Sequence, residues 1–318
     1  MQNISVIVTG AGGFIGSHLC LKLLDSKCSV IGIDNFCTGD RRNLKLLKSH
    51  PNSQNLRFIE DDCTKSWPDL IGEVDKLDLV IHLASPASPP LYQSMPLETL
   101  RVNSTGLKEA LMFATDRKAR VVFASTSEVY GDALVHPQPE SYWGNVNSFG
   151  PRSCYDEAKR FGEALLYTWN QVHGTKHGLF RIFNTYGPQM NPEDGRVIVN
   201  FLEQARKSEP LTIYGDGSQT RSFCYVSDLV DGILKYAASD LAEPVNLGNP
   251  KEFSILELVE TIKDIYGKEL ETKFLPLPTD DPMQRQPDIS KAKESLNWSP
   301  KIELKEGLQK TMSWLSSL

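Results

Sequence analysis

The sequence predicts an α/β fold, in which a doubly wound parallel sheet carries a smaller, mostly C-terminal α/β domain. Short β-branched runs alternate with longer helical stretches in the first half of the chain, an order that gives right-handed βαβ crossovers and a parallel sheet. The run Leu79–Ala84 is almost wholly apolar, as a strand buried on both faces should be. After about residue 185 glycine and proline become frequent and strands shorten, which indicates a second, loop-rich unit.

The elements follow in chain order. Strands are expected at 4–8, 29–34, 56–60, 78–84, 120–125 and 179–183, and helices at 14–26, 96–116, 154–173, 226–239, 254–266 and 304–317. His82, inside the apolar strand, is expected to be a hydrogen-bonded core residue. We assign residues 1–184 plus 225–249 to the sheet domain and residues 185–224 plus 250–318 to the smaller domain.

Composition excludes several classes of protein. With 318 residues, 40% hydrophobic and 23% charged, the chain is neither disordered nor too short for a sizeable core. A net charge of −6 argues against a nucleic-acid partner. No apolar run approaches the ~18–20 residues of a membrane span. The strand-like Ile4–Val8 begins without a secretory signal, and the six scattered cysteines are typical of free thiols, so we expect a cytoplasmic protein.

No metal site is expected. His173 and His177 are four residues apart, as two ligands on a helix can be, but Gly174 between them interrupts the helix. Surface positions are expected for both.

A glycine loop joins the first strand to the first helix. Gly10, Gly13 and Gly16 form G-x-x-G-x-x-G, which lets the backbone turn sharply and approach a pyrophosphate at the N-terminus of the helix. Asp34 ends the second strand, where a carboxylate binds the hydroxyls of an adenosine ribose and repels a 2′-phosphate. The pattern predicts a Rossmann-type dinucleotide site that prefers NAD to NADP.

A tyrosine and a lysine form the candidate catalytic pair. Tyr155 and Lys159 lie four residues apart on a predicted helix, so the ammonium is expected beside the phenol, where it lowers the pKa of the tyrosine. Ser125–Glu128 ends a parallel strand, at the sheet edge where ligands bind. Together with the glycine loop, these motifs resemble those of the extended short-chain dehydrogenase/reductase superfamily.

Within that superfamily the chain resembles the UDP-glucuronate decarboxylases, or UDP-xylose synthases, over most of its length. The segments that carry the resemblance are His82–Pro90, Ala124–Asp132, His136–Glu140, Cys154–Arg160, Arg181–Pro188, Asp194–Val197, Tyr214–Phe223, Val245–Pro250 and Asp281–Asp288. The chain departs from the family pattern at Gln93-Ser94-Met95, Ser148-Phe149 and Gln189, which we expect to border the substrate pocket.

The resemblance assigns roles to individual residues. Tyr155 is the base on the sugar 4-hydroxyl, Lys159 holds the nicotinamide ribose and Thr126 binds the 4-oxygen. Ser127 and Glu128 are expected near C5 and the carboxylate, with Arg285 near the anionic groups of the substrate. The implied NAD contacts are Gly10, Gly13, Phe14, Ile15, Gly16, Asp34, Asn35, Asp62, Leu83, Ala84, Tyr155 and Lys159. The implied substrate contacts are Ser88, Pro89, Asn184, Arg196, Tyr214, Arg221 and Arg285.

The implied reaction is oxidation at C4, loss of CO₂ from the 4-ketone and reduction to UDP-xylose, with NAD recycled in each turnover. Four alternatives remain. A nucleotide-sugar 4,6-dehydratase typically has Asp where Ser127 stands, and a 4-epimerase often has Ser where Glu128 stands. A partial decarboxylase would release the 4-keto pentose, and a non-catalytic NAD-binding sensor would be expected to lose the Tyr–Lys pair. The resemblance also implies a homodimer joined by a four-helix bundle.

Overall fold

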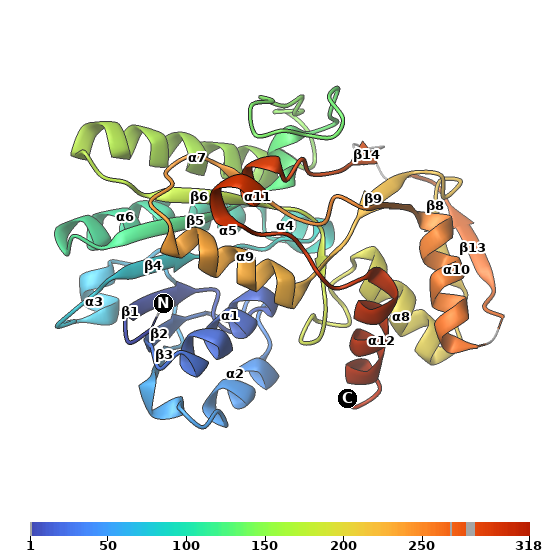
Figure 1. Cartoon of the computed structure of the whole chain (residues 1–318), viewed down its shortest axis with the longest axis horizontal. Helices are drawn as coiled ribbons and strands as arrows, with labels where there is room; N and C mark the ends of the chain where they lie inside the picture. Colours follow the sequence, from blue (N-terminus) through green and yellow to red (C-terminus); the bar gives the residue numbers. More distant parts are fainter. Residues whose placement is uncertain (1, 268, 278–283) are drawn as a thin grey trace.

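Seven parallel strands form the main sheet of the computed structural model, which describes residues 2–267, 269–277 and 284–318 (Figure 1). The strand order is β3-β2-β1-β4-β5-β6-β11. The strands are β1 (Ser5–Thr9), β2 (Ser29–Ile33), β3 (Leu56–Ile59), β4 (Leu79–His82), β5 (Arg120–Thr126), β6 (Gly178–Ile182) and β11 (Val245–Leu247). The first six confirm the predicted strands, whereas the sequence analysis missed β11.

Helices cover both faces of this sheet. One face carries α1 (Phe14–Asp25), α2 (Arg41–Lys48) and α9 (Val226–Ala238); the other carries α3 (Trp67–Ile71), α5 (Pro96–Arg101), α6 (Leu107–Asp116) and α7 (Ser153–His173) (Figure 1). The predicted helix 96–116 is continuous, with a π-helical turn at Val102–Gly106 between α5 and α6. Helices on both faces of a parallel sheet confirm the doubly wound fold.

The side-chain alternation along the strands builds two separate cores. Val6 and Val8 join the cluster under α1 and α9, whereas Ile7 joins the cluster under α6 and α7. Because successive strand residues point to opposite faces, a strand covered on both sides must be apolar throughout. His82 is one of the polar exceptions, and its Nδ1 lies 3.0 Å from the Oγ1 of Thr9, another of them. This confirms the prediction of a hydrogen-bonded core histidine.

The prediction for His177 is wrong. Its side chain is buried, and its Nδ1 accepts a hydrogen bond of 3.0 Å from the backbone N–H of Val121. Gly174 ends α7 in a left-handed conformation, as expected, and the chain then turns inward to begin β6. The turn therefore places His177 against the start of β5, while His173 stays exposed on the helix.

A smaller α/β lobe stands beside the sheet, on the right in Figure 1. Its helices are α8 (Val197–Lys207), α10 (Ile255–Tyr266) and α12 (Leu304–Leu315), and short helices α4 (Pro89–Ser94) and α11 (Ser290–Leu296) lie nearer the sheet. Its short strands are β7 (Thr185–Tyr186), β8 (Leu211–Tyr214), β9 (Thr220–Ser222), β10 (Cys224–Tyr225), β12 (Glu252–Ser254), β13 (Thr272–Leu275) and β14 (Gln284–Arg285). The domain boundaries given above stay a prediction.

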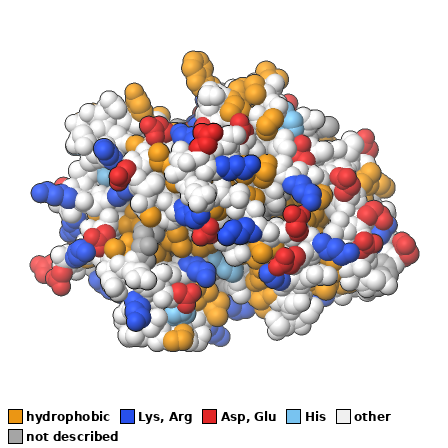
Figure 2. All heavy atoms as spheres, in the orientation of Figure 1, with side chains coloured by type: hydrophobic (Ala, Val, Ile, Leu, Met, Phe, Trp, Pro, Cys, Tyr) orange, Lys and Arg blue, Asp and Glu red, His pale blue; other side chains and the backbone are white. Residues whose placement is uncertain are grey.

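The outer surface is mixed in charge. On the face shown in Figure 2, acidic and basic side chains are interspersed rather than gathered into one field. Among the described residues, no helix has both the length and the apolar character that crossing a membrane requires.

Candidate active site

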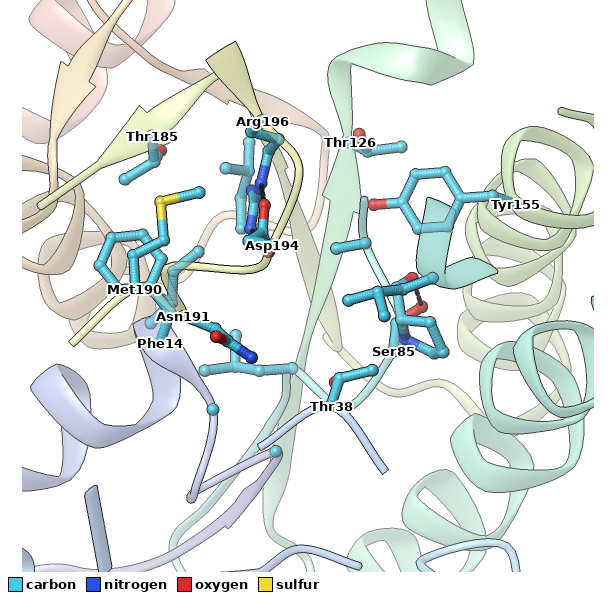
Figure 3. A pocket seen from close by; sticks show the side chains of 18 of the residues that line it. Phe14, Thr38, Ser85, Thr126, Tyr155, Thr185, Met190, Asn191, Asp194 and Arg196 are labelled. Atoms are coloured by element: carbon cyan, nitrogen blue, oxygen red, sulfur yellow. Dashed lines mark hydrogen bonds and ion pairs between the residues drawn. The ribbon is translucent and has the colours of Figure 1, made fainter. Parts of the chain in front are cut away.

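A cavity of about 550 Å³ lies where the carboxyl ends of the sheet strands meet the smaller lobe (Figure 3). Parallel sheets bind ligands at this edge because the strand ends and the following loops converge there. The cavity is lined by the predicted residues Gly10, Gly13, Phe14, Ile15, Gly16, Asp34, Asn35, Asp62, Leu83, Ala84, Pro89, Thr126, Ser127, Glu128, Tyr155, Lys159, Asn184, Arg196, Tyr214, Arg221 and Arg285.

Ser88 is the exception among the predicted residues. It is fully buried beneath the loop at the start of α4, and the described lining of the cavity includes its neighbour Pro89 instead. Of the departures from the family pattern, Gln93 and Gln189 line the cavity. Ser148 and Phe149 are exposed and lie outside that lining, so the expectation that they border the pocket is wrong. Asp281–Met283 of the last quoted segment falls outside the described residues.

The glycine loop approaches its neighbours too closely for side chains. A Cβ on Gly16 would overlap the carbonyl oxygen of Gly10, and Gly10 itself has φ +72° with its ideal Cβ position 3.0 Å from the backbone of Ala84. α1 begins directly after Gly13, so the N–H groups of its first turn remain available for an anion. The loop therefore fits the pyrophosphate of a dinucleotide.

Asp34 is fastened beside this loop. Its Oδ2 accepts a hydrogen bond from the N–H of Gly12 at 2.8 Å, and its Oδ1 accepts one from Phe36 at 2.7 Å. Burial raises the pKa of Asp34, and these backbone hydrogen bonds oppose the rise. Because a carboxylate has about four acceptor positions, the group keeps capacity for ribose hydroxyls.

Tyr155 and Lys159 lie side by side on α7. The Nζ of Lys159 donates to the carbonyl of Ala124 at 2.8 Å and lies 5.7 Å from the centre of the Tyr155 ring. Burial lowers the pKa of Lys159 to about 7 and raises the pKa of Tyr155 to about 12, with a hydrogen bond to Thr126 opposing the second shift. The expected lowering of the tyrosine pKa is thus wrong for the ligand-free protein, because burial outweighs the nearby groups.

The phenol of Tyr155 points into the cavity beside Thr126 and faces Arg196 and Asp194 across it (Figure 3). Its ring stacks on that of Tyr92, with centroids 4.9 Å apart and planes 6° apart. Such stacking holds the catalytic ring in one orientation. The sequence analysis did not identify Tyr92.

Glu128 is clamped between two arginines. Its Oε1 lies 2.9 Å from the Nη1 of Arg285, and its Oε2 lies 2.5 Å from the Nη2 of Arg152. Burial alone would raise the pKa of Glu128, but the two guanidinium groups outweigh burial and lower the pKa to about 2. The Nη1 of Arg285 also donates to the Ser127 Oγ at 3.1 Å. The structure therefore brings Ser127, Glu128 and Arg285 together as predicted, with Glu128 ionised.

The opposite wall of the cavity carries further cations. Arg196 makes a bidentate pair with Asp194, at 2.5 and 2.9 Å. Arg221 is buried, and its Nη1 donates to the carbonyl of Thr220. Guanidinium groups on a cavity wall suit phosphate oxygens.

Sequence reasoning missed Arg152 and Asp156. They are four residues apart and flank Tyr155, so helical spacing alone indicates that they share a face. What spacing does not reveal is that Glu128, from another element, lies against that face.

Comparison with known proteins then assigns the family. A family model described as the NAD dependent epimerase/dehydratase family matches residues 6–248. The chain belongs to this family. Within it, the chain is 49% identical to UDP-glucuronic acid decarboxylase 5 of Arabidopsis thaliana, an alignment that covers 96% of this chain and 88% of the relative. It is 47% identical to UDP-glucuronic acid decarboxylase 1 of Danio rerio, over 98% of this chain and 72% of the relative.

Solved structures of the family share the fold at lower identity. One is a UDP-glucuronic acid 4-epimerase from Bacillus cereus in complex with UDP-glucuronic acid and NAD. It superposes with a TM-score of 0.86 at 29% identity and covers 99% of both chains. Because epimerases and decarboxylases share this fold, the side chains around the cavity decide which reaction a member of the family catalyses.

Proposed function

We propose that this protein converts UDP-glucuronate to UDP-xylose and CO₂, with NAD as a cofactor regenerated in each turnover. The observation that carries the proposal is the clamped Glu128–Arg285 pair beside Thr126, Tyr155 and Lys159 at one cavity wall. Identities of 47–50% over nearly the whole chain to several UDP-glucuronic acid decarboxylases support it.

The cofactor site fits NAD on the chain's own geometry. The glycine loop and the first turn of α1 would hold the pyrophosphate, and Asp34 would hold the adenosine ribose. NAD bound there would supply the hydride acceptor for oxidation at C4 of the sugar and the hydride donor for the later reduction. Lys159 is buried beside Tyr155, and its ammonium would hold the second ribose.

Tyr155 exchanges the proton of the sugar 4-hydroxyl. It takes this proton while C4 is oxidised to a ketone, and Thr126 holds the same oxygen. The ketone is β to the carboxylate, so the C5–C6 bond breaks with its electrons moving into the C4 carbonyl as an enolate. The protonated phenol of Tyr155 donates a hydrogen bond to the enolate oxygen.

Glu128 and Arg285 act at the carboxylate end of the sugar. The low pKa of Glu128 keeps it ionised, so its charge opposes the substrate carboxylate and favours the departure of neutral CO₂. Arg285 holds Glu128 and Ser127 in place, and its positive charge attracts the anionic end of the substrate. A 4,6-dehydratase would need an acid where Ser127 stands, and a 4-epimerase would need no carboxylate at Glu128.

We further propose a homodimer in the cytoplasm. Helices α5 and α7 pack together and leave apolar side chains exposed, among them Leu97 (73%), Phe161 (51%) and Tyr167 (68%). A second copy that covers these helices would form a four-helix bundle. All six cysteines are free thiols, which supports a reducing compartment.

One experiment tests the reaction. The purified protein is incubated with UDP-glucuronate and NAD⁺, and CO₂ release and the sugar products are followed by NMR. We expect UDP-xylose and CO₂ in equal amounts, with no lasting build-up of reduced cofactor. Conversion to UDP-galacturonate without CO₂ would identify a 4-epimerase, and a released 4-keto pentose would identify a partial decarboxylase; either result contradicts the proposal.

A further inference from the structure

A second cavity, of about 240 Å³, adjoins the active site at Glu128. Glu128, Arg152 and Arg285 line both this rear cavity and the main one. The remaining described residues that line the rear cavity are Gly131, Asp132, Asn145, Val146, Asn147 and Asp156. It is therefore a polar chamber that shares a charged wall with the reaction site.

Asp156 is the buried acid of this chamber. Only 5% of the residue is exposed, and its Oδ1 has no hydrogen-bond partner among the described residues. The Oη of Tyr92 and the Nε of Arg285, also beside Glu128, lack partners within the same described part of the chain. Buried polar atoms almost always have a partner, and a polar cavity of this size has room for water. Asp156 and Arg285 line the rear cavity, so water there would supply the partners that their buried atoms lack.

The proposed reaction needs an acid that supplies a proton to C5, and none of the residues discussed so far has that role. Breaking the C5–C6 bond leaves its electron pair on the enolate, so C5 must gain one proton, and each turnover removes one proton from solution. Tyr155 returns its proton to the 4-oxygen when C4 is reduced, so the same proton is not available to C5. Glu128 is ionised between two arginines and holds no proton at rest.

We propose that Asp156 holds the proton destined for C5 and delivers it through water in the rear cavity. This inference rests on the proposed function. The proton passes from the carboxyl group of Asp156 to cavity water, and from water through the Oε atoms of Glu128 to C5 as the enolate collapses to the ketone. The Asp156 carboxylate then regains a proton from solvent along the side of the cavity where Asp132 is exposed. Asp156 is thus a positioning residue that acts through Glu128.

The charges around Asp156 suit this role. Burial raises its pKa to about 7, the charge of Glu128 raises it further, and Arg152 and Arg285 oppose the rise. The other titratable groups near it in the described structure are Asp132 in the lining of the rear cavity, Tyr92 on α4, and Cys154, Tyr155 and Glu157 on α7. An acid with a pKa near the working pH both donates a proton and regains it.

The test is single turnover with Asp156→Asn, which keeps the shape of the side chain but cannot pass on the proton. We expect the absorbance of reduced nicotinamide to appear at the wild-type rate, because oxidation at C4 does not use Asp156. UDP-xylose formation should slow by roughly 10²-fold, with reduced cofactor accumulating. The control is Glu157→Gln, which removes an acid from the adjacent position. Glu157 pairs with Arg160 at 3.6 Å, and the rates of this variant should match those of wild type.

Several outcomes decide the proposal. In the wild-type protein, the rate of UDP-xylose formation after oxidation at C4 should fall as the pH rises through about 7. Asp156→Asn should lose this dependence. Formate should restore part of the activity of Asp156→Ala by entering the cavity. An equal slowing of oxidation and decarboxylation in Asp156→Asn, or UDP-xylose formation within about twofold of wild type, would overturn the relay.

If the variants do not fold, the wild-type pH profile decides alone: a reprotonation step that is flat between pH values of about 6 and 8 contradicts a relay acid of this pKa. Failure of the proposed function looks different, because the wild-type protein would then release no CO₂ from UDP-glucuronate.

Discussion

Two neighbouring acids at the residue scale are driven to opposite protonation states. Glu128 contacts two guanidinium groups directly, which lowers its pKa to about 2, whereas burial and the charge of Glu128 raise the pKa of Asp156 to about 7. Carboxyl pairs whose environments separate their pKa values commonly divide acid and base roles between them. Here Glu128 carries the negative charge and Asp156, in the rear cavity, holds the proton.

Tyr155→Phe removes the group that accepts the 4-hydroxyl proton. We expect turnover to fall by roughly 10³-fold, with NAD affinity and the thermal unfolding midpoint close to wild type, because the ring still stacks on Tyr92. Steady-state rates with UDP-glucuronate and a direct NAD titration measure the two effects. A variant that retains activity within a few-fold of wild type would refute the role of Tyr155.

Glu128→Gln keeps the size of the side chain and removes its charge. UDP-xylose formation should fall by roughly 10²-fold, because the neutral amide neither opposes the substrate carboxylate nor passes a proton. CO₂ release and sugar product per enzyme are measured with UDP-glucuronate, and NAD binding serves as the control for folding. Wild-type rates in this variant would make Glu128 a purely structural residue.

The depressed pKa of Glu128 also predicts how its ion pairs depend on pH. The carboxylate is ionised down to a pKa of about 2 when folded, against an ordinary value of 4.5. The pairs therefore stabilise the fold fully above the unfolded value, and this contribution is lost as the pH falls through the folded value. Urea unfolding should show Glu128→Gln less stable than wild type by about 3–5 kcal/mol at pH 7, with the gap closing at acid pH. A gap that does not change with pH contradicts the assignment.

One helix organises the site at the element scale. α7 contributes Tyr155 and Lys159 to the main cavity and Asp156 to the rear one, and its N-cap residue Arg152 lines both. Because residues three and four apart share a helical face, the buried face of α7 and its N-cap hold all four side chains at fixed spacing. α1 does the same for the cofactor, since its first turn begins at the glycine loop.

Gly16→Ala tests how tightly α1 is docked. The added Cβ would overlap the carbonyl oxygen of Gly10, so the loop must shift away from the place where the pyrophosphate binds. NAD affinity should fall by at least roughly tenfold, and stability by about 1–3 kcal/mol.

The matched control is Gly106→Ala, in the helical stretch between α5 and α6. Its Cβ would approach no described neighbour closer than 3.5 Å, so we expect unchanged NAD binding and equal or greater stability. Isothermal titration with NAD and thermal unfolding compare the two variants. Equal NAD affinity in both would show that the close contact at Gly16 does not shape the cofactor site.

At the scale of the whole molecule, the sheet and the smaller lobe meet at the active site. The sheet supplies Thr126 at the end of β5, Asp34 after β2 and the glycine loop after β1, while the lobe supplies Arg221 and Arg285 from the paired strands β9 and β14. Neither part alone encloses the cavity. Helix α7, to which the exposed Phe161 and Tyr167 belong, lies on the sheet side of the molecule, away from the lobe (Figure 1).

A double variant, Phe161→Glu with Tyr167→Glu, tests the proposed dimer. Charges on this face would be buried against a second copy without partners, so the protein should sediment as a monomer. Phe149→Glu is the control, because Phe149 is 97% exposed on a loop outside both helices, and this variant should stay dimeric. Analytical ultracentrifugation distinguishes the two masses. A wild-type protein that sediments as a monomer at micromolar concentration contradicts the dimer.

The sequence by itself determined the features that depend on local spacing. Alternating strands and helices predicted the sheet, and Gly10, Gly13 and Gly16 predicted the turn at α1, because these patterns follow from the repeat of each element and from the freedom of glycine. The resemblance to a family then predicted that Glu128 and Arg285 lie in the same site, although they are 157 positions apart along the chain. Local patterning gave no reason to pair them.

Only the tertiary structure decided the ionisation of those groups. Burial raised the pKa of Tyr155 where a lysine one turn away predicted the reverse, and the turn after α7 buried His177 where its spacing predicted exposure. Asp156 is one residue from Tyr155 in the sequence, yet its pKa is raised by burial and by the charge of Glu128 from another element. Its Oδ1 also has no hydrogen-bond partner among the described residues. Electrostatic environment is the sum of contacts from several elements, so it becomes readable only when the chain is folded.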